Sequence, residues 1–150
     1  MSEAIRQLTA LDVTFRLMPI FREVAAKFCD RNEFLYPVPG DAQHFVQSCR
    51  QLIDSGLLRI WEMPEAKAIL GGMFFPDIFT GQLSAWLCFW GAAKGCSALP
   101  LLSHFERVAR REHCRLIYAA ALDNRHAALM EKLYRRRGFK LAEKNFVKFL

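Results

Sequence analysis

Residues 116 to 139 constrain the fold of this chain most, because an apolar strand and an amphipathic helix follow each other there within a short segment. The apolar run from Leu116 to Leu122 is typical of a buried strand. Asp123 or Asn124 can then cap a helix through a side-chain oxygen. The apolar face of that helix holds Leu129, Met130, Leu133 and Tyr134.

A glycine marks the end of this helix. Gly138 can take the left-handed conformation that closes a helix, and Phe139 begins an apolar stretch that extends to Leu150. The segment therefore predicts a strand, a helix and a further strand.

The preceding part of the chain predicts strands and helices without a linker or a repeat. We expect a strand at 4–9, followed by a helix that begins or is kinked at Pro19; a strand over 11–17 is the alternative. Asp41 can cap a second helix that ends at Gly56.

Three apolar segments separated by turn residues predict an antiparallel meander at 57–63, 67–75 and 82–90. The pair Gly71-Gly72 suggests a bulge within it. A helical stripe then runs from Ser97 or Ala98 to about Cys114.

This order, together with the ending Tyr134-x-x-x-Gly138-Phe139, resembles that of the GNAT-type N-acetyltransferases. The resemblance implies a single α/β (α+β) domain over residues 1–150. It also implies a central mixed, mostly antiparallel sheet of six or seven strands, flanked by about four helices. The ending from Gly138 to Lys148 is similar to that of GNAT-like proteins encoded by bacteriophages.

The resemblance further implies acetyl-CoA as cofactor. The backbone at Phe89 and Trp90 would pair with the pantetheine arm. The pyrophosphate would lie on the loop formed by Lys94, Gly95, Cys96, Ser97 and Ala98. In the family this loop reads Gln/Arg-x-x-Gly-x-Gly/Ala, whereas this chain has Ala92 at the first position and Ser97 at the last. Asn124 is a looser match to a cofactor-binding asparagine, because it stands ten residues before Tyr134 where the family commonly has seven.

Tyr134 stands where the family places the acid that protonates the departing thiolate. A tyrosine that only closes the apolar stripe is the alternative. The family often has a glutamate on the fourth strand as base, but residues 83–90 contain no acid. Glu62 and Asp77 are the substitutes, although each is expected to be a surface carboxylate, and His104 is expected to be exposed.

These observations leave two main hypotheses. The first is an acetyl-CoA-dependent N-acetyltransferase that acetylates a primary amine of a small molecule or a protein. The second is a catalytically inactive GNAT-fold binding protein, such as a phage protein that binds a host partner. Nucleic-acid binding ranks last, because the basic half has no recognised docking motif.

Composition and charge limit the remaining possibilities. The chain has 150 residues and 53% apolar content, which fits one globular domain. No apolar run is long enough to span a membrane, so we expect a cytoplasmic protein. The five scattered cysteines favour neither disulfides nor a metal site. Residues 101–150 hold 12 basic and 5 acidic side chains, a net charge of +7 that would attract an anionic cofactor.

Overall fold

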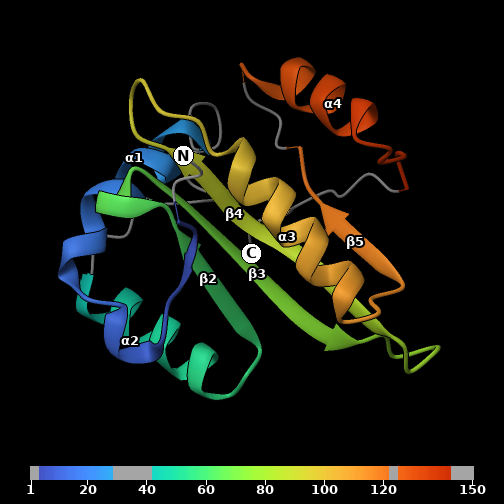
Figure 1. Cartoon of the computed structure of the whole chain (residues 1–150), viewed down its shortest axis with the longest axis horizontal. Helices are drawn as coiled ribbons and strands as arrows, with labels where there is room; N and C mark the ends of the chain where they lie inside the picture. The colour runs from blue at the N-terminus through green and yellow to red at the C-terminus, as the bar shows by residue number, and fades with distance from the viewer. Residues whose placement is uncertain (1–3, 29–41, 122–124, 143–150) are drawn as a thin grey trace, which may run out of the picture.

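A computed structural model describes residues 4–28, 42–121 and 125–142 (Figure 1). Its sheet has five strands in the order β1-β2-β3-β4-β5. They are β1 (Arg6–Gln7), β2 (Leu58–Glu62), β3 (Ala68–Pro76), β4 (Leu83–Ala92) and β5 (Leu116–Ala119). Neighbouring strands are antiparallel except β4 and β5, which are parallel. The expected mixed, mostly antiparallel sheet is confirmed, with five strands in the described residues instead of six or seven.

Four helices flank this sheet, as expected: α1 (Met18–Phe28), α2 (Ala42–Asp54), α3 (Leu99–Arg111) and α4 (Ala127–Arg136). Three short 3₁₀ turns lie in the connections: η1 (Ala10–Asp12) and η2 (Phe15–Leu17) between β1 and α1, and η3 (Pro64–Ala66) between β2 and β3. The alternative of a strand at 11–17 is therefore wrong. Pro19 lies in the first turn of α1, where a missing amide donor costs the helix nothing.

The sheet separates two apolar clusters. On one face α1 and α2 bury a cluster that includes Phe21, Val46 and Ile60. On the other face α3 buries a cluster around Trp61 and Phe105, to which α4 and β5 also contribute (Figure 1). Each strand therefore has one side chain toward α1 and α2 and the next toward α3, as the two-residue period of a strand requires.

An irregularity between β3 and β4 interrupts that period. Gly71 pairs with Phe89 while Gly72 pairs with Leu87, so Cys88 on β4 is an extra residue with no partner on β3. The expected bulge is confirmed. A Cβ at Gly71 would overlap the Phe89 ring, and a Cβ at Gly72 would overlap the Phe105 ring. The two glycines thus admit one aromatic ring on each face of the sheet.

The bulge changes which face the later residues of β4 reach. Before it, Ala85 and Leu87 pack in the α3 cluster. After it, Phe89 packs against the α1 and α2 cluster, whereas Trp90 packs on the α3 side. One inserted residue therefore aims the Trp90 indole toward α3 and α4.

Gly138 ends α4 as expected. It has a φ of +85°, its amide donates to the Arg135 carbonyl, and the Phe139 amide donates to the Tyr134 carbonyl at 3.0 Å. The Phe139 ring packs on the Tyr134 ring at a centroid distance of 5.2 Å. These bonds and this contact make up a Schellman motif, in which the residue after the glycine folds back on the last turn. Gly56 ends α2 in the same way, with a φ of +77°.

Two expectations for the C-terminal third require correction or lie outside the described residues. The apolar run from Leu116 forms a strand only as far as Ala119, and it is half-exposed, with Leu116 39% exposed. Its apolar side chains are therefore not all used in the core. A strand was expected from Phe139 to Leu150. Residues 139–142 form no strand, and residues 143–150 lie outside the described residues.

Candidate active site

The sheet opens where the pairing between β4 and β5 ends. The two strands pair from Ser84 with Leu116 to Leu87 with Ala119. β4 then continues from Cys88 to Ala92 with no β5 partner in the described part of the chain. Within the described residues, the backbone groups of β4 on this edge therefore have no neighbouring strand to bond beyond Leu87.

The phenol of Tyr134 lies at this opening. Its hydroxyl accepts a hydrogen bond from the Trp90 indole nitrogen at 3.2 Å and donates one to the Ala120 carbonyl at 3.5 Å. Because Trp90 belongs to β4 and Ala120 follows β5, the hydroxyl bridges the two sides of the opening. Tyr134 is 7% exposed.

This environment controls the protonation of the phenol. Burial raises the pKa of Tyr134, and the hydrogen bond from Trp90 opposes part of that rise. The side chain therefore keeps its proton at neutral pH and can donate it. The sequence predicted Tyr134, but it predicted only a backbone role for Trp90, because the bulge that directs its indole could not be placed from the sequence.

The α3 helix holds α4 in this position through a buried carboxylate. Glu106 accepts a hydrogen bond from the Arg137 guanidinium at 2.7 Å, and Arg137 also donates to the Ser103 hydroxyl at 2.9 Å. Arg137 directly follows α4 and is three residues from Tyr134. Arg137, one of the 12 basic residues of 101–150, therefore joins α3 to α4.

The loop between β4 and α3 has the exposure that an anion-binding loop needs. Lys94, Gly95, Cys96 and Ser97 are exposed, and Ala98 is buried at the start of α3. Gly95 has a φ of +81°, and the Cys96 amide donates to the Ala93 carbonyl to close the turn. The Ser97 hydroxyl accepts the Leu99 amide at 3.3 Å.

Four amides of this loop remain available as donors. Within the described residues, the backbone N–H groups of Lys94, Gly95, Ser97 and Ala98 have no hydrogen-bond partner. They lie beside the N-terminus of α3, where the helix dipole also favours negative charge. The Lys27 ammonium group of α1 lies near the start of this loop, where it donates to the Ala92 carbonyl at 2.6 Å, and it also pairs with Glu23 at 3.4 Å. Sequence reasoning missed Lys27, whose spacing gives no such signal.

Neither carboxylate considered as a base is suited to the opening. Glu62 is buried, not at the surface as expected, and its carboxylate accepts hydrogen bonds from Arg6 at 2.7 Å and Arg16 at 2.9 Å. Burial acts to raise the pKa of Glu62, but the bonds and charges of the two arginines outweigh it and lower the pKa. Glu62 also lies two strands from β4, about 10 Å away.

Asp77 lies in the β3–β4 turn, at the end of these strands remote from the opening. Its carboxylate accepts the amides of Phe79 and Thr80, which lower its pKa. His104 is half-buried against Trp61 at a ring distance of 5.8 Å, so the expectation that it is exposed needs correction.

Two of the residues predicted for the site remain, Phe89 and Asn124. Phe89 contributes backbone at the opening, while its ring packs on Phe21 at 5.3 Å beneath α1. Asn124 lies outside the described residues. No group of three or more histidine, cysteine, aspartate or glutamate side chains suited to a metal is found in the described ranges. No helix in the part that the structure describes is long and apolar enough to cross a bilayer.

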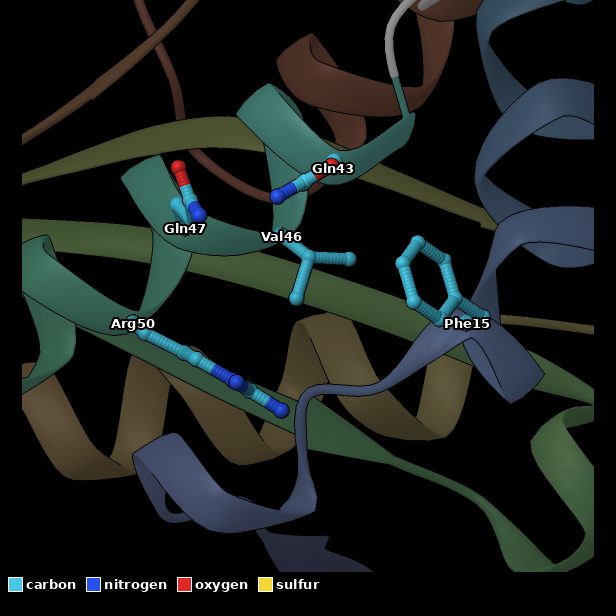
Figure 2. Close-up of a pocket in the computed structure, with 5 residues that line it drawn as sticks. All are labelled: Phe15, Gln43, Val46, Gln47 and Arg50. Carbon is cyan, nitrogen blue, oxygen red and sulfur yellow. The ribbon is translucent and has the colours of Figure 1, made fainter.

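A surface hollow of about 350 Å³ lies away from the opening, between η2 and α2. Figure 2 shows the Phe15 ring facing the side chains of α2, with Gln43, Val46, Gln47 and Arg50 completing the lining. The Arg50 guanidinium donates to the Val13 carbonyl at 2.9 Å and so joins α2 to the N-terminal segment. None of the residues predicted from the sequence lines this hollow.

Comparison with known proteins gives matches at the level of structure only. No protein-family model matches the chain. No curated protein matches it either.

Among solved structures, the chain is similar to an aminoglycoside acetyltransferase from an uncultured soil metagenomic sample, with a TM-score of 0.74, 16% identity, and coverage of 100% of this chain and 99% of that one. It is similar to a predicted acetyltransferase with acetyl-CoA from Clostridium acetobutylicum, with a TM-score of 0.70, 16% identity and coverage of 97% and 95%. It also matches an aminoglycoside N-acetyltransferase, AAC(6')-Iy, in complex with CoA, with a TM-score of 0.64, 13% identity and coverage of 98% and 93%. These matches extend over nearly the whole of each chain, so this protein has the fold of the GNAT-type acetyltransferases.

Proposed function

We propose that the protein is an acetyl-CoA-dependent N-acetyltransferase that transfers an acetyl group to a primary amine. The observation that carries this proposal is the Tyr134 hydroxyl, a buried proton donor held between Trp90 and Ala120 where β4 and β5 separate. Two of the similar structures contain acetyl-CoA or CoA, which supports a cofactor of this kind.

The residues present fit a CoA-type cofactor. The free amides of Gly95, Ser97 and Ala98, with Lys94 and Lys27 nearby, would hold its pyrophosphate. The backbone of Phe89 and Trp90 would pair with the pantetheine arm, and Asn124 remains a proposed contact. When bound, the cofactor supplies an activated acetyl group on a thiol leaving group. Tyr134 would give its proton to that departing thiolate, a contribution of roughly 10²- to 10⁴-fold.

The Tyr134→Phe variant tests this role. It removes the hydroxyl and keeps the ring that packs on Phe139, so turnover should fall by about 10²-fold with little change in acetyl-CoA affinity. Turnover is measured as thiol release and affinity by calorimetry. Equal turnover in the variant would remove Tyr134 as the acid.

A binding protein without catalysis is the second candidate, and one observation favours it. The Trp90 indole already uses the Tyr134 hydroxyl as acceptor, so that hydroxyl is engaged within the protein before any cofactor arrives. Under this alternative, which includes a phage protein directed at a host partner, the opening stays closed to the cofactor. A thermal-shift titration separates the two, because acetyl-CoA at 100 times its dissociation constant should stabilise the fold by about 2.7 kcal/mol. No shift at millimolar acetyl-CoA would favour the inactive protein.

A further inference from the structure

A row of partly exposed aromatic side chains lies on the sheet face opposite Tyr134. Phe75 of β3, Trp86 of β4 and Tyr118 of β5 stand side by side, with ring centroids 6.4 Å and 6.5 Å apart. Trp86 is 48% exposed, and the other two are half-buried. We call these three residues the aromatic platform.

The platform directly adjoins the opening. Trp86 pairs with Tyr118, and the next pair, Leu87 with Ala119, is where the pairing of β4 with β5 ends. On this face the described residues of α1 contact β4 beyond the bulge, where Phe21 packs on Phe89 and a Cβ at Gly91 would lie 2.6 Å from Val24. A molecule stacked on the platform would therefore lie beside the point where the acetyl carbon is expected.

Among the described residues that border the opening, no side chain is suited to act as a general base. Residues 86–92 of β4 and residues 118–121, which end β5 and follow it, contain no carboxylate and no imidazole, and Cys88 and Tyr118 are their titratable side chains. An amine must be unprotonated to attack. An alkyl amine with a pKa near that of lysine, about 10, is neutral in roughly one molecule per thousand or fewer at pH 7. Without a base, such an acceptor would react slowly.

From the platform and from the absence of a base among the described residues at the opening, and resting on the proposed acetyltransferase function, we infer that the acceptor is a weakly basic aromatic amine of the aniline type. Its ring stacks on Trp86 and Tyr118. Its amino group is already neutral at pH 7, because the nitrogen lone pair is delocalised into the ring. An alkyl ammonium ion would also be attracted to these rings, but it cannot attack before it loses a proton.

The reaction balances without a further co-reactant. The amine lone pair forms the N–C bond to the thioester carbonyl carbon, and the C–S bond breaks with its electron pair on sulfur. The thiolate takes a proton from Tyr134, the new amide nitrogen releases one proton to water, and water restores the phenol. The products are the N-aryl acetamide and CoA.

Two amines of similar shape test the inference. 4-Methylaniline and 4-methylbenzylamine are compared by thiol release and by mass of the product, with purified full-length protein and acetyl-CoA. The aniline should react more than about tenfold faster at pH 7, and the difference should shrink by up to about tenfold for each pH unit as the benzylamine deprotonates. A faster benzylamine at pH 7 would overturn the inference.

The platform itself is tested by Trp86→Ala. Loss of stacking should raise KM for 4-methylaniline by about two- to tenfold, with kcat much less affected and acetyl-CoA affinity unchanged. Phe79→Ala is the matched control, because Phe79 is 90% exposed on the β3–β4 turn and should leave both constants unchanged. An unchanged KM for 4-methylaniline in Trp86→Ala would overturn the platform as the binding site of the acceptor. Acetyl-CoA binding with no acetylation of 4-methylaniline would overturn the acceptor class and leave the proposed function standing, whereas no acetyl-CoA binding would overturn both.

Discussion

At the scale of single residues, the hydrogen bond between Trp90 and Tyr134 has a chemical consequence as well as a structural one. A donor to the phenol oxygen stabilises the phenolate that forms when the proton leaves. Trp90 therefore makes Tyr134 a stronger acid than burial alone would leave it. Trp90 is in this sense a positioning residue that acts through Tyr134.

Trp90→Phe should show this effect, because it keeps an aromatic ring and removes only the N–H donor. The pKa of Tyr134 should rise, so the alkaline limb of the kcat profile should move to higher pH, and kcat should fall by about two- to tenfold, the worth of one hydrogen bond. The pH profile of the Tyr134→Phe variant supplies the control. In that background a further Trp90→Phe change should leave the profile where it is. An identical profile for Trp90→Phe and the parent protein would contradict the role.

At the scale of elements, the ending Tyr-x-x-x-Gly-Phe has a structural explanation independent of any cofactor. Gly138 supplies the left-handed residue, and Phe139 supplies the apolar contact that closes α4 back on Tyr134. The same residues that suggested a catalytic motif are those that a Schellman motif requires. The motif thus fixes the position and orientation of the Tyr134 ring, whether or not Tyr134 is a catalytic acid.

Gly138→Ala should therefore affect stability and activity together. No atom crowds a Cβ at this position, so its cost comes from the left-handed backbone alone, about 1–2 kcal/mol. Gly56→Ala is a matched control, since Gly56 ends α2 with the same motif and equally open space. Urea unfolding should give similar losses for both variants. Turnover measured well below either melting temperature should fall only in Gly138→Ala, and equal turnover would show that the end of α4 does not position Tyr134.

The sequence indicated most elements but not the details that form the opening. Periodicity placed α2, α3 and the β2–β3–β4 meander, because each has a clear apolar face between Gly or Pro turns. Gly71-Gly72 indicated a bulge, yet the extra residue is Cys88 on the neighbouring strand. Which strand carries an insertion depends on long-range pairing, which local pattern does not contain.

Long-range contacts also decide the burial of charged residues, and the sequence does not show them. Glu62 was expected to be a surface carboxylate, because its partners Arg6 and Arg16 are far from it in sequence and close only in the fold. The positions of Tyr134 at the end of α4 and of the glycine turn before α3 could be predicted, since their signals are local: a helix stop and a glycine turn before a helix. Their roles in binding and catalysis stay predictions.

At the scale of the whole molecule, the Glu62 cluster ties the N-terminal segment to the sheet. Arg6 on β1 and Arg16 on η2 both bind this carboxylate of β2, and Arg6 also pairs with Asp12 of η1 at 2.9 Å. In addition to the backbone pairing of β1 with β2, one buried acidic group thus holds the segment that leads into α1 on the sheet. Global stability should depend on its charge.

Glu62→Gln tests that dependence. Breaking a buried ion pair costs about 3–5 kcal/mol, and because the two arginines here are half-exposed we expect about 1–3 kcal/mol at pH 7. The folded state lowers the pKa of Glu62, so its contribution is fully present above the unfolded pKa and is lost as pH falls through the folded one. Urea unfolding at several pH values should therefore show the gap between parent and variant closing below about pH 4.5. A gap that stays constant into acid would contradict an ionic role.

The bulge at Cys88 has a consequence for how substitutions along β4 will be tolerated. Before it, odd-numbered positions are the ones enclosed beneath α3; after it, even-numbered positions take that place. A mutational scan interpreted with one uninterrupted alternation would therefore assign Trp90 and Ala92 to the wrong side. The inward and outward pattern of this strand inverts halfway along its length, at the point where it parts from its neighbour.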